Sequence, residues 1–204
     1  LPKPTMRPTS APLSLPPTSM PTTLSTSDME ALEAFCQDVN CSSNYLFSSW
    51  NFTRDHTGHY VHDVCAEEWY GAACSSDGED TAPASLRVLN LSQSDVRGTL
   101  SSSLSTLTKV EVIDLSHNSI SGGIPPHWGE LKSLHVLRLD HNQLTGHIDM
   151  CGLLYQPIHM VQVDVQHNHF SCFLSCWLPY LQYLKMDGGL EECDWPTGQP
   201  TTQP

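Results

Sequence analysis

Histidines are the residues of this chain whose type and spacing come closest to a chemical motif. His56, His59 and His62 recur at every third position, and Asp63 follows directly. Imidazole nitrogens and carboxylate oxygens are ligands that Zn²⁺ accepts. Gly58 and the flanking residues favour a surface loop, and the spacing matches no standard metal-binding motif. We therefore expect an exposed loop here, with zinc binding as the weaker alternative.

A second set of histidines stands before asparagine: His117, His141 and His167. Arranged one above another, such imidazoles could bind a metal or sense acidity. Histidine is, however, a common residue before the asparagine of the repeat described below. We therefore favour a structural interpretation of this set.

The composition excludes several classes of function. The 204 residues include 9 Lys+Arg and 22 Asp+Glu, a net charge of −13, so no basic surface is available for nucleic acid. No run of about 18 apolar residues occurs, which argues against a membrane-spanning segment. The sequence also contains no Gly-rich phosphate loop, G-x-S-x-G elbow or H-E-x-x-H motif. We expect neither catalysis nor a cofactor.

Eight cysteines fall into a front set and a back set of four. A zinc site would use paired C-x2-C knuckles, which the sequence lacks, so we expect disulfides and an oxidising compartment. Three N-x-S/T sequons agree with secretion, although each one also fits chance. The candidate N-glycosylation sites are Asn40, Asn51 and Asn90.

Both ends of the chain are rich in Pro, Ser and Thr. Such segments bury too little apolar surface to offset their ordering entropy, so residues 1–28 and 196–204 are expected to be extended and disordered. In a secreted protein the composition indicates O-glycosylated stalks, with unmodified linkers as the alternative. Residues 1–28 lack the apolar stretch of a signal peptide and the chain does not begin with Met, which we take to indicate a processed or excised segment.

A repeated apolar frame runs through the middle of the chain. Its units are spaced 24, 24, 26 and 21 residues apart and begin at Leu86, Val110, Leu134, Met160 and Leu181. The frame L-x-x-L-x-L-x-x-N-x-L is that of a leucine-rich repeat, in which stacked units make the core together. We predict an α/β solenoid, a right-handed coil of about five repeats with short parallel strands. Its bend asparagines should bond backbone groups as a ladder: Asn118, Asn142 and Asn168.

Further features resemble the plant-type, 24-residue leucine-rich repeat. The second and third units continue as S-G-G-I-P and T-G-H-I, similar to L-x-G-x-I-P. The segment from Cys65 to Cys74, preceded by Trp50, resembles the cysteine-containing N-terminal cap of that class. With its Ser/Thr/Pro-rich ends, the chain also resembles surface antigens and proteophosphoglycan-type proteins of trypanosomatid parasites. The resemblance covers roughly residues 29–194, with far fewer units than plant receptor ectodomains, and implies extracellular recognition or adhesion.

Caps are expected to close both ends of the solenoid. Ser27 and Glu30 form a capping box, which should open a helix that covers the open edge of the first repeat. The apolar stripe of this helix is Met29, Leu32, Phe35 and Val39. We place the N-terminal cap at 29–85, the repeats at 86–180, and the degenerate last repeat with the C-terminal cap at 181–195.

Equivalent places in successive units predict the bridges of the C-terminal cap. Such places lie about 5 Å apart, inside the Cα window for a disulfide, so we predict Cys151–Cys176 and Cys172–Cys193. The resemblance to the plant-type cap implies Cys65–Cys74, which leaves Cys36–Cys41 as the fourth bridge.

Outward strand positions form columns on the predicted concave face. The middle column is Asn90, Asp114, Arg138, Asp164 and Lys185, and beside it run Val88, Val112, Val136, Gln162 and Tyr183. Five strands give a face of roughly 19 Å, which about six residues of an extended peptide would span. The candidate ligand-binding residues are Asp114, Arg138, Gln162, Asp164, Tyr183 and Lys185. The alternative is that they merely keep the face soluble, and a glycan on Asn90 would push binding toward the C-terminal units.

These features together predict a secreted or cell-surface protein that recognises an extracellular protein or glycan. Attachment to host cells is implied by the trypanosomatid resemblance alone. One alternative is a structural glycoprotein of a cell coat or matrix, without a specific ligand. A second alternative is an inhibitor of a secreted hydrolase. We expect no nucleic-acid partner and no direct membrane insertion of this segment.

Overall fold

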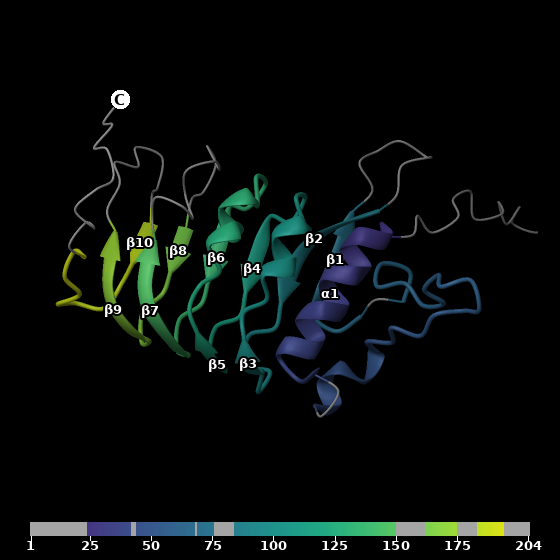
Figure 1. Ribbon diagram of the computed structural model, residues 1–204, viewed down its shortest axis with the longest axis horizontal. Coiled ribbons are helices and arrows are strands. Elements are labelled where there is room, and N and C mark those ends of the chain that lie inside the picture. The colour runs from purple at the N-terminus through teal and green to yellow at the C-terminus, as the bar shows by residue number, and fades with distance from the viewer. Residues whose placement is uncertain are drawn as a thin grey trace, which may run out of the picture.

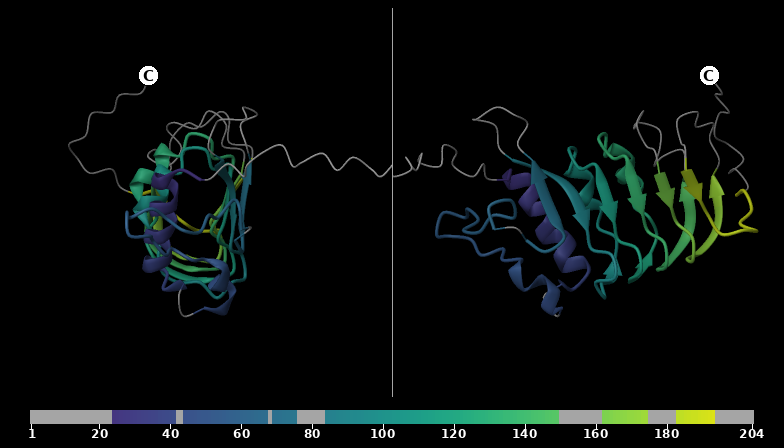
Figure 2. Two further views of the ribbon diagram at one scale, coloured as in Figure 1. Left: turned by 90° about the vertical axis from the view of Figure 1, so that its right-hand side faces the viewer. Right: turned by 180° about the vertical axis from the view of Figure 1, so that it is seen from behind.

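The computed structural model describes residues 24–41, 44–67, 69–75, 84–149, 162–174 and 183–193. In this part of the chain, the backbone winds into successive coils that stack along the longest dimension of the molecule (Figure 1). Viewed along that dimension, the coils superimpose as a ring of backbone (Figure 2, left). The chain is therefore a solenoid, with helix α1 at its N-terminal end (Figure 1).

One side of the solenoid is a six-stranded sheet in the order β1-β2-β4-β6-β8-β10. Each coil contributes one parallel strand, and these strands are β2 (Ser85–Asn90), β4 (Val112–Asp114), β6 (Val136–Arg138), β8 (Gln162–Asp164) and β10 (Tyr183–Lys185). The register repeats without a shift, so that Val112 lies between Val88 and Val136. The columns predicted from the sequence are therefore columns of this sheet.

A second, four-stranded sheet runs along the coils in the order β3-β5-β7-β9. Its strands are β3 (Arg97–Thr99), β5 (Ser119–Gly122), β7 (Gln143–Asp149) and β9 (His169–Leu174). Each strand follows the bend of its coil. The repeat frame did not predict this sheet, because such short segments become strands through pairing with the neighbouring coils rather than through their own apolar alternation.

Helical segments complete the first two coils and the cap. η3 (Ser102–Thr106) contacts both η4 (Pro126–Glu130) and α1 (Thr26–Asp38), whereas η2 (Tyr45–Ser49) lies in the cap. Trp128 of η4 is buried, and its indole N–H donates to the carbonyl of Ser101 at 2.9 Å. The helices α1, η3 and η4 thus form one row that runs from the cap along the first coils.

Inward apolar side chains form one continuous core. The central inward residues of four successive coils have no exposed surface: Leu89, Ile113, Leu137 and Val163. Burying such a side chain contributes about 1.5–3 kcal/mol. Leu32 and Phe35 of α1 belong to the same core, and both are fully buried. Cap and coils therefore share one hydrophobic interior.

The predicted asparagine ladder is confirmed. Asn118 Nδ2 donates to the carbonyl of Leu91 in the preceding coil at 2.8 Å, and its Oδ1 accepts from the N–H of Val96 at 2.9 Å. Asn142 and Asn168 repeat this pattern in the next two coils. The ladder satisfies backbone groups that the bend would otherwise leave without partners.

Helix α1 begins earlier than the sequence pattern predicts. Its N-cap is Ser25 rather than Ser27, and the Ser25 hydroxyl accepts from the N–H of Asp28 at 3.2 Å. Ser25 has the extended backbone that an N-cap needs, whereas Ser27 lies inside the first turn. Leu24 is also buried and pairs with Ala84. The cap therefore includes residues from 24 onward, although the sequence pattern assigned residues 24–28 to the stalk.

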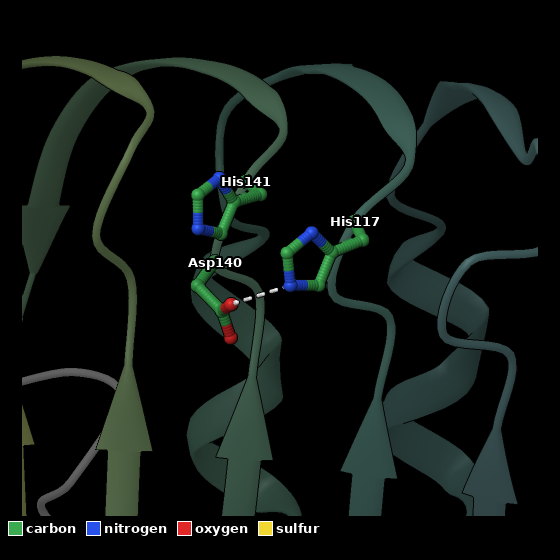
Figure 3. Close-up of side chains that lie close together, drawn as sticks. All are labelled: His117, Asp140 and His141. Carbon is green, nitrogen blue, oxygen red and sulfur yellow. Dashed lines mark ion pairs between the residues drawn. The ribbon is translucent and has the colours of Figure 1, made fainter.

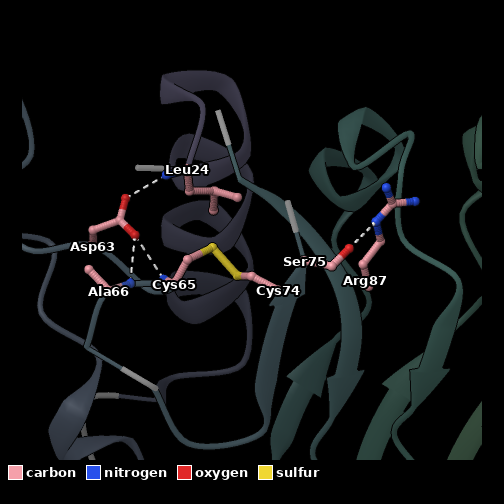
Figure 4. The surroundings of a disulfide bond; sticks show 7 residues. All are labelled: Leu24, Asp63, Cys65, Ala66, Cys74, Ser75 and Arg87. Atoms are coloured by element: carbon pink, nitrogen blue, oxygen red, sulfur yellow. Dashed lines mark hydrogen bonds between the residues drawn. A yellow bond between two sulfur atoms is a disulfide. The ribbon is translucent and has the colours of Figure 1, made fainter. Parts of the chain in front are cut away.

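The edge of the first sheet is covered by a strand, while the expected helix, α1, packs against η3 of the first coil. β1 (Ala72–Ser75) pairs antiparallel with β2, and a bulge lies between Ala73 and Cys74. The Cys65–Cys74 disulfide ties this strand to the loop that precedes it (Figure 4). Asp63 holds that loop in place, because its carboxylate accepts from the backbone N–H groups of Leu24, Cys65 and Ala66 at 2.6, 2.8 and 3.0 Å (Figure 4).

Candidate functional site

The column face is the outward side of β2, β4, β6, β8 and β10. All six candidate ligand-binding residues lie on it, in adjacent columns, as the constant register requires. The neighbouring column of valines is half-buried at Val88, Val112 and Val136. The sequence therefore placed these residues correctly relative to one another.

The acidic members of the middle column are buried rather than open to a ligand. Asp114 is 7% exposed and Asp164 is 4% exposed. Arg138 Nη1 lies 3.3 Å from Asp114 Oδ2, and Lys185 Nζ lies 3.0 Å from Asp164 Oδ2. Asp114 Oδ1 also accepts from both the backbone and the hydroxyl of Ser116. These carboxylates therefore bond groups of their own coils and pair with the cations of the next coil. The cationic side chains are the more exposed partners.

An exposed aromatic side chain and an exposed cation lie at the C-terminal end of the column face. Tyr183 is 60% exposed, and the Lys185 side chain two residues further along β10 is 55% exposed. Because alternate strand residues share a face, both side chains project from the same side. Gln162 is half-buried in the adjacent strand, paired in register with Tyr183. An aromatic ring, an ammonium group and an amide thus stand together.

The described sequons differ in position. Asn90 is exposed at the N-terminal end of the column face, and its Oδ1 accepts from the N–H and hydroxyl of Ser92 at 3.1 and 2.9 Å. Asn51 is half-buried in the cap, and Asn40 is exposed just after α1. A glycan at Asn90 would therefore cover the opposite end of the face from Tyr183.

The first histidine set lies in an exposed cap loop. His59 Nδ1 is 2.6 Å from the hydroxyl of Thr57, and His62 Nδ1 is 2.7 Å from Glu67 Oε1. The Glu67 carboxyl has a lowered pKa, first because of the hydrogen bond from His62. Asp63 is occupied by the three backbone N–H groups described above. The close group of potential metal ligands within the described ranges lies elsewhere, at the bends of the coils.

Three of the four predicted disulfides are present. Cys36–Cys41, Cys65–Cys74 and Cys172–Cys193 have Cα separations of 5.0, 5.5 and 5.1 Å, within the range for such bridges. Cys172 lies in β9, and Cys193 follows the isolated bridge between Phe173 and Glu192. The predicted pair Cys151–Cys176 lies outside the described residues.

The cap contains a tightly coupled polar group. Arg54 Nη2 and the Tyr60 hydroxyl both donate to Glu33 Oε2, at 2.8 and 2.6 Å, and the Arg54 guanidinium lies 4.1 Å from the centre of the Tyr60 ring. Partial burial acts to raise the pKa of Glu33, but the hydrogen bonds from Tyr60 and Arg54 outweigh it, so the pKa lies below its ordinary value. Burial and the bond to Glu33 raise the pKa of Tyr60. This group joins α1 to the loop that follows it.

One residue at the bends was not predicted from the sequence. Asp140 is 5% exposed and lies beside His117 and His141, where the three residues offer ligand atoms within 4.8 Å of one another. The adjacent residues Asp140 and His141, together with His117 one coil earlier, were the available signal. Because the equivalent position holds Ser116 in the preceding coil, the repeat pattern drew no attention to it.

Comparisons with known proteins agree with this geometry. The leucine rich repeat family model matches residues 84–144. Among solved structures, the ectodomain of the receptor kinase GASSHO1/SCHENGEN3 from Arabidopsis thaliana, in complex with CASPARIAN STRIP INTEGRITY FACTOR 2, is similar with a TM-score of 0.58 and 20% identity. The fold is a leucine-rich-repeat solenoid. The similarity covers 78% of this chain but 21% of that ectodomain, so the chain spans about a fifth of its length.

Two other solved structures match over nearly their whole length. The BIR2 ectodomain from Arabidopsis thaliana has a TM-score of 0.52 and 19% identity, covering 82% of this chain and 96% of that chain. A chain of the BIR3–SERK2 complex from the same plant has a TM-score of 0.52 and 16% identity, covering 80% and 97%. No curated protein is significantly similar to the chain. Among the described residues, no helix has the length and apolar character needed to cross a membrane.

Proposed function

We propose that this chain is an extracellular recognition module that binds a protein or peptide ligand on the column face, centred on Tyr183. The observation that carries the proposal is the exposure of Tyr183 and Lys185 at one end of the column face, where Tyr183 continues the column of half-buried valines beyond Gln162. Tyrosine supplies a large contact area at low entropic cost, which suits it to recognition. An extended peptide of about six residues spans the face.

Several features support an extracellular setting and a binding role. Disulfides persist in oxidising compartments, and the described residues include three of them. The ectodomain of GASSHO1/SCHENGEN3 is itself complexed with CASPARIAN STRIP INTEGRITY FACTOR 2. The Ser/Thr/Pro-rich ends favour display at a cell surface, in the manner of the trypanosomatid surface antigens that the sequence resembles. Attachment to a host cell is one form that such recognition would take.

The experiment is a selection from a phage-displayed peptide library on the immobilised full chain, followed by affinity measurements with the selected peptides. Tyr183→Ser should lower the affinity for the selected peptides at least about tenfold, because the substitution removes an aromatic contact that the bound peptide would bury. Tyr45→Ser is the matched control, because Tyr45 is 83% exposed on the cap and away from the column face. Equal affinities for the Tyr183→Ser variant and the parent chain would contradict the proposed site.

A structural coat role is the second candidate, and the burial of Asp114 and Asp164 favours it. Charges that serve only to hold coils together need no ligand. This role predicts that no peptide is enriched on the parent chain compared with the Tyr183→Ser variant. Inhibition of a secreted hydrolase would appear instead as lost hydrolase activity when the full chain is added.

A further inference from the structure

The bends at the rim of the column face stack three imidazole rings. His117, His141 and His167 each have a φ of 55°, a backbone conformation that the repeat imposes at this position. The rings of His117 and His141 are 4.2 Å apart and inclined by 12°, and those of His141 and His167 are 4.1 Å apart. The parallel register thus gathers three potential nitrogen ligands on one rim.

A buried carboxylate lies beside two of these rings. Asp140 Oδ2 is 3.7 Å from His117 Nε2, as the dashed line in Figure 3 shows. Asp140 Oδ1 is buried and accepts no hydrogen bond from the described residues, although Arg138 Nη2 lies 3.4 Å away. A buried carboxylate oxygen without a hydrogen bond is costly and calls for a physical explanation, of which a bound cation is one.

The geometry requires little movement to enclose an ion. The ligand atoms of His117, Asp140 and His141 lie within 4.8 Å of one another. Two ligands of one tetrahedral Zn²⁺ are about 3.4 Å apart, given metal–ligand bonds of about 2.1 Å. Both rings are exposed and can turn. The backbone is held by two hydrogen bonds of 2.9 Å, one from the N–H of His117 to the carbonyl of Asp140 and one from the N–H of His141 to the carbonyl of Gln166. The backbone of the bend is therefore fixed, and the two imidazole rings can reorient toward an ion.

The local charge also favours a cation. Asp114 and Asp140 share the guanidinium of Arg138, at 3.3 and 3.4 Å. Two carboxylates and one guanidinium leave one negative charge at this point of the rim. Burial reduces the screening of that charge by salt. A divalent ion bound there would offset that charge and add a second cationic partner for Asp140 beside Arg138.

We propose that His117, Asp140 and His141 bind one divalent transition-metal ion of the class that prefers imidazole ligands, such as Zn²⁺ or Cu²⁺. Two imidazole nitrogens and one carboxylate oxygen are a ligand set that Zn²⁺ accepts in proteins, with the fourth position open to water or to a donor atom of a partner. Imidazole suits Zn²⁺ and Cu²⁺, whereas Mg²⁺ and Ca²⁺ prefer oxygen ligands throughout. The site should therefore reject Mg²⁺ and Ca²⁺.

The test is calorimetric titration of the untagged full chain, first stripped with a chelator, with ZnCl₂ and separately with MgCl₂. The informative variants are His117→Gln and His141→Gln, because the first coil has Gln93 at the same position with a φ of 54°. Each should weaken Zn²⁺ binding at least about tenfold, the effect expected for loss of one ligand. His127→Gln is the matched control, since His127 is exposed on η4 and outside the group. The melting temperatures of the metal-free variants should equal that of the parent.

Four results would overturn the proposal. The first is a parent chain that binds neither Zn²⁺ nor Cu²⁺, and the second is unchanged Zn²⁺ affinity in both His→Gln variants. The third is Zn²⁺ affinity that is lost in the His→Gln variants but kept in Asp140→Asn, which would leave a two-histidine site without the carboxylate. If His59→Gln removes binding instead, the ion belongs to the cap loop, and the rim site is wrong.

Discussion

Asn118 and Asn142 donate to the same carbonyl oxygen, that of Leu115, each at 2.9 Å. Asn142 and Asn168 share the carbonyl of Leu139 in the same way, at 3.1 and 3.0 Å. Each side chain therefore closes the bend of its own coil and also fastens that bend to the preceding one. The ladder couples neighbouring coils through buried or half-buried polar groups, in which a missing partner is expensive.

Replacing Asn142 by alanine should destabilise the solenoid by about 3 kcal/mol, because the substitution removes the acceptor of the Ile120 N–H and the donor to three carbonyls. Chemical denaturation followed by circular dichroism measures the loss. Gln143→Ala is the matched control, since Gln143 is the exposed next residue, and its effect should be within about 0.5 kcal/mol of zero. Equal losses in the two variants would show that the ladder adds no stability.

Gly98→Ala should be more damaging than Gly146→Ala, although both glycines follow the bend of a coil at positive φ, 111° and 84°. A Cβ at Gly98 would collide with the backbone carbonyl of Asp38 at the end of α1, whereas nothing lies within 4 Å of one at Gly146. The positive φ costs about 1 kcal/mol in both variants, and the clash adds about 1–3 kcal/mol in the first. Thermal unfolding of the two variants measures the difference. Similar melting temperatures would mean that α1 does not pack closely on the first coil.

Glu33→Gln should lower the melting temperature at pH 7, with a smaller difference from the parent in acid. The pKa of Glu33 in the fold lies below its ordinary value of 4.5, so the ionised group stabilises the fold above that pH. This contribution disappears as the pH falls through the folded-state pKa. Melting temperatures measured between pH 7 and about pH 3 test the trend. Glu30→Gln should change less, because Arg54 Nη1 lies 3.8 Å from the exposed Glu30 carboxylate; a pH-independent effect of Glu33→Gln would contradict the coupling.

Removing the Cys172–Cys193 bridge by a double Cys→Ser variant should loosen the C-terminal coils first. The bridge closes a loop with a sequence separation of 21, which corresponds to about 3 kcal/mol of restrained chain entropy. Because each coil contacts only its neighbours, the loss should stay local. Hydrogen exchange should therefore accelerate in β9 and β10, with β2 and β4 still protected. The Cys65→Ser/Cys74→Ser double variant should give the reverse pattern, and uniform acceleration in both variants would contradict local opening.

The periodic features of the fold could be predicted from the sequence, and the single-position features could not. Leu89, Ile113 and Leu137 recur at one spacing, so their burial and the columns beside them follow from the repeat. The N-cap at Ser25 instead depends on where the chain turns away from Ala84, a contact distant in sequence. Local patterns contain no information about such contacts.

The candidate sites divide in the same way. The positions of Asp114 and Asp164 in the middle column were predicted, but their burial was not, because it results from ion pairs between neighbouring coils. The rim histidines were visible as a column, whereas Asp140 was not. Asp140 matters because it lies close to His117 of the adjacent coil, and only the folded chain defines that distance.

The unbroken register from Val88 through Val112 to Val136 makes each coil an interchangeable module. Excising one 24-residue unit would bring Val88 against Val136 with matching strand ends, a matching asparagine bend and both sulfur-bridged ends intact. Duplicating the unit would lengthen the molecule in the same whole steps. Descendants of this gene could therefore change the span of the exposed surface by duplication or deletion, without redesign of either terminus.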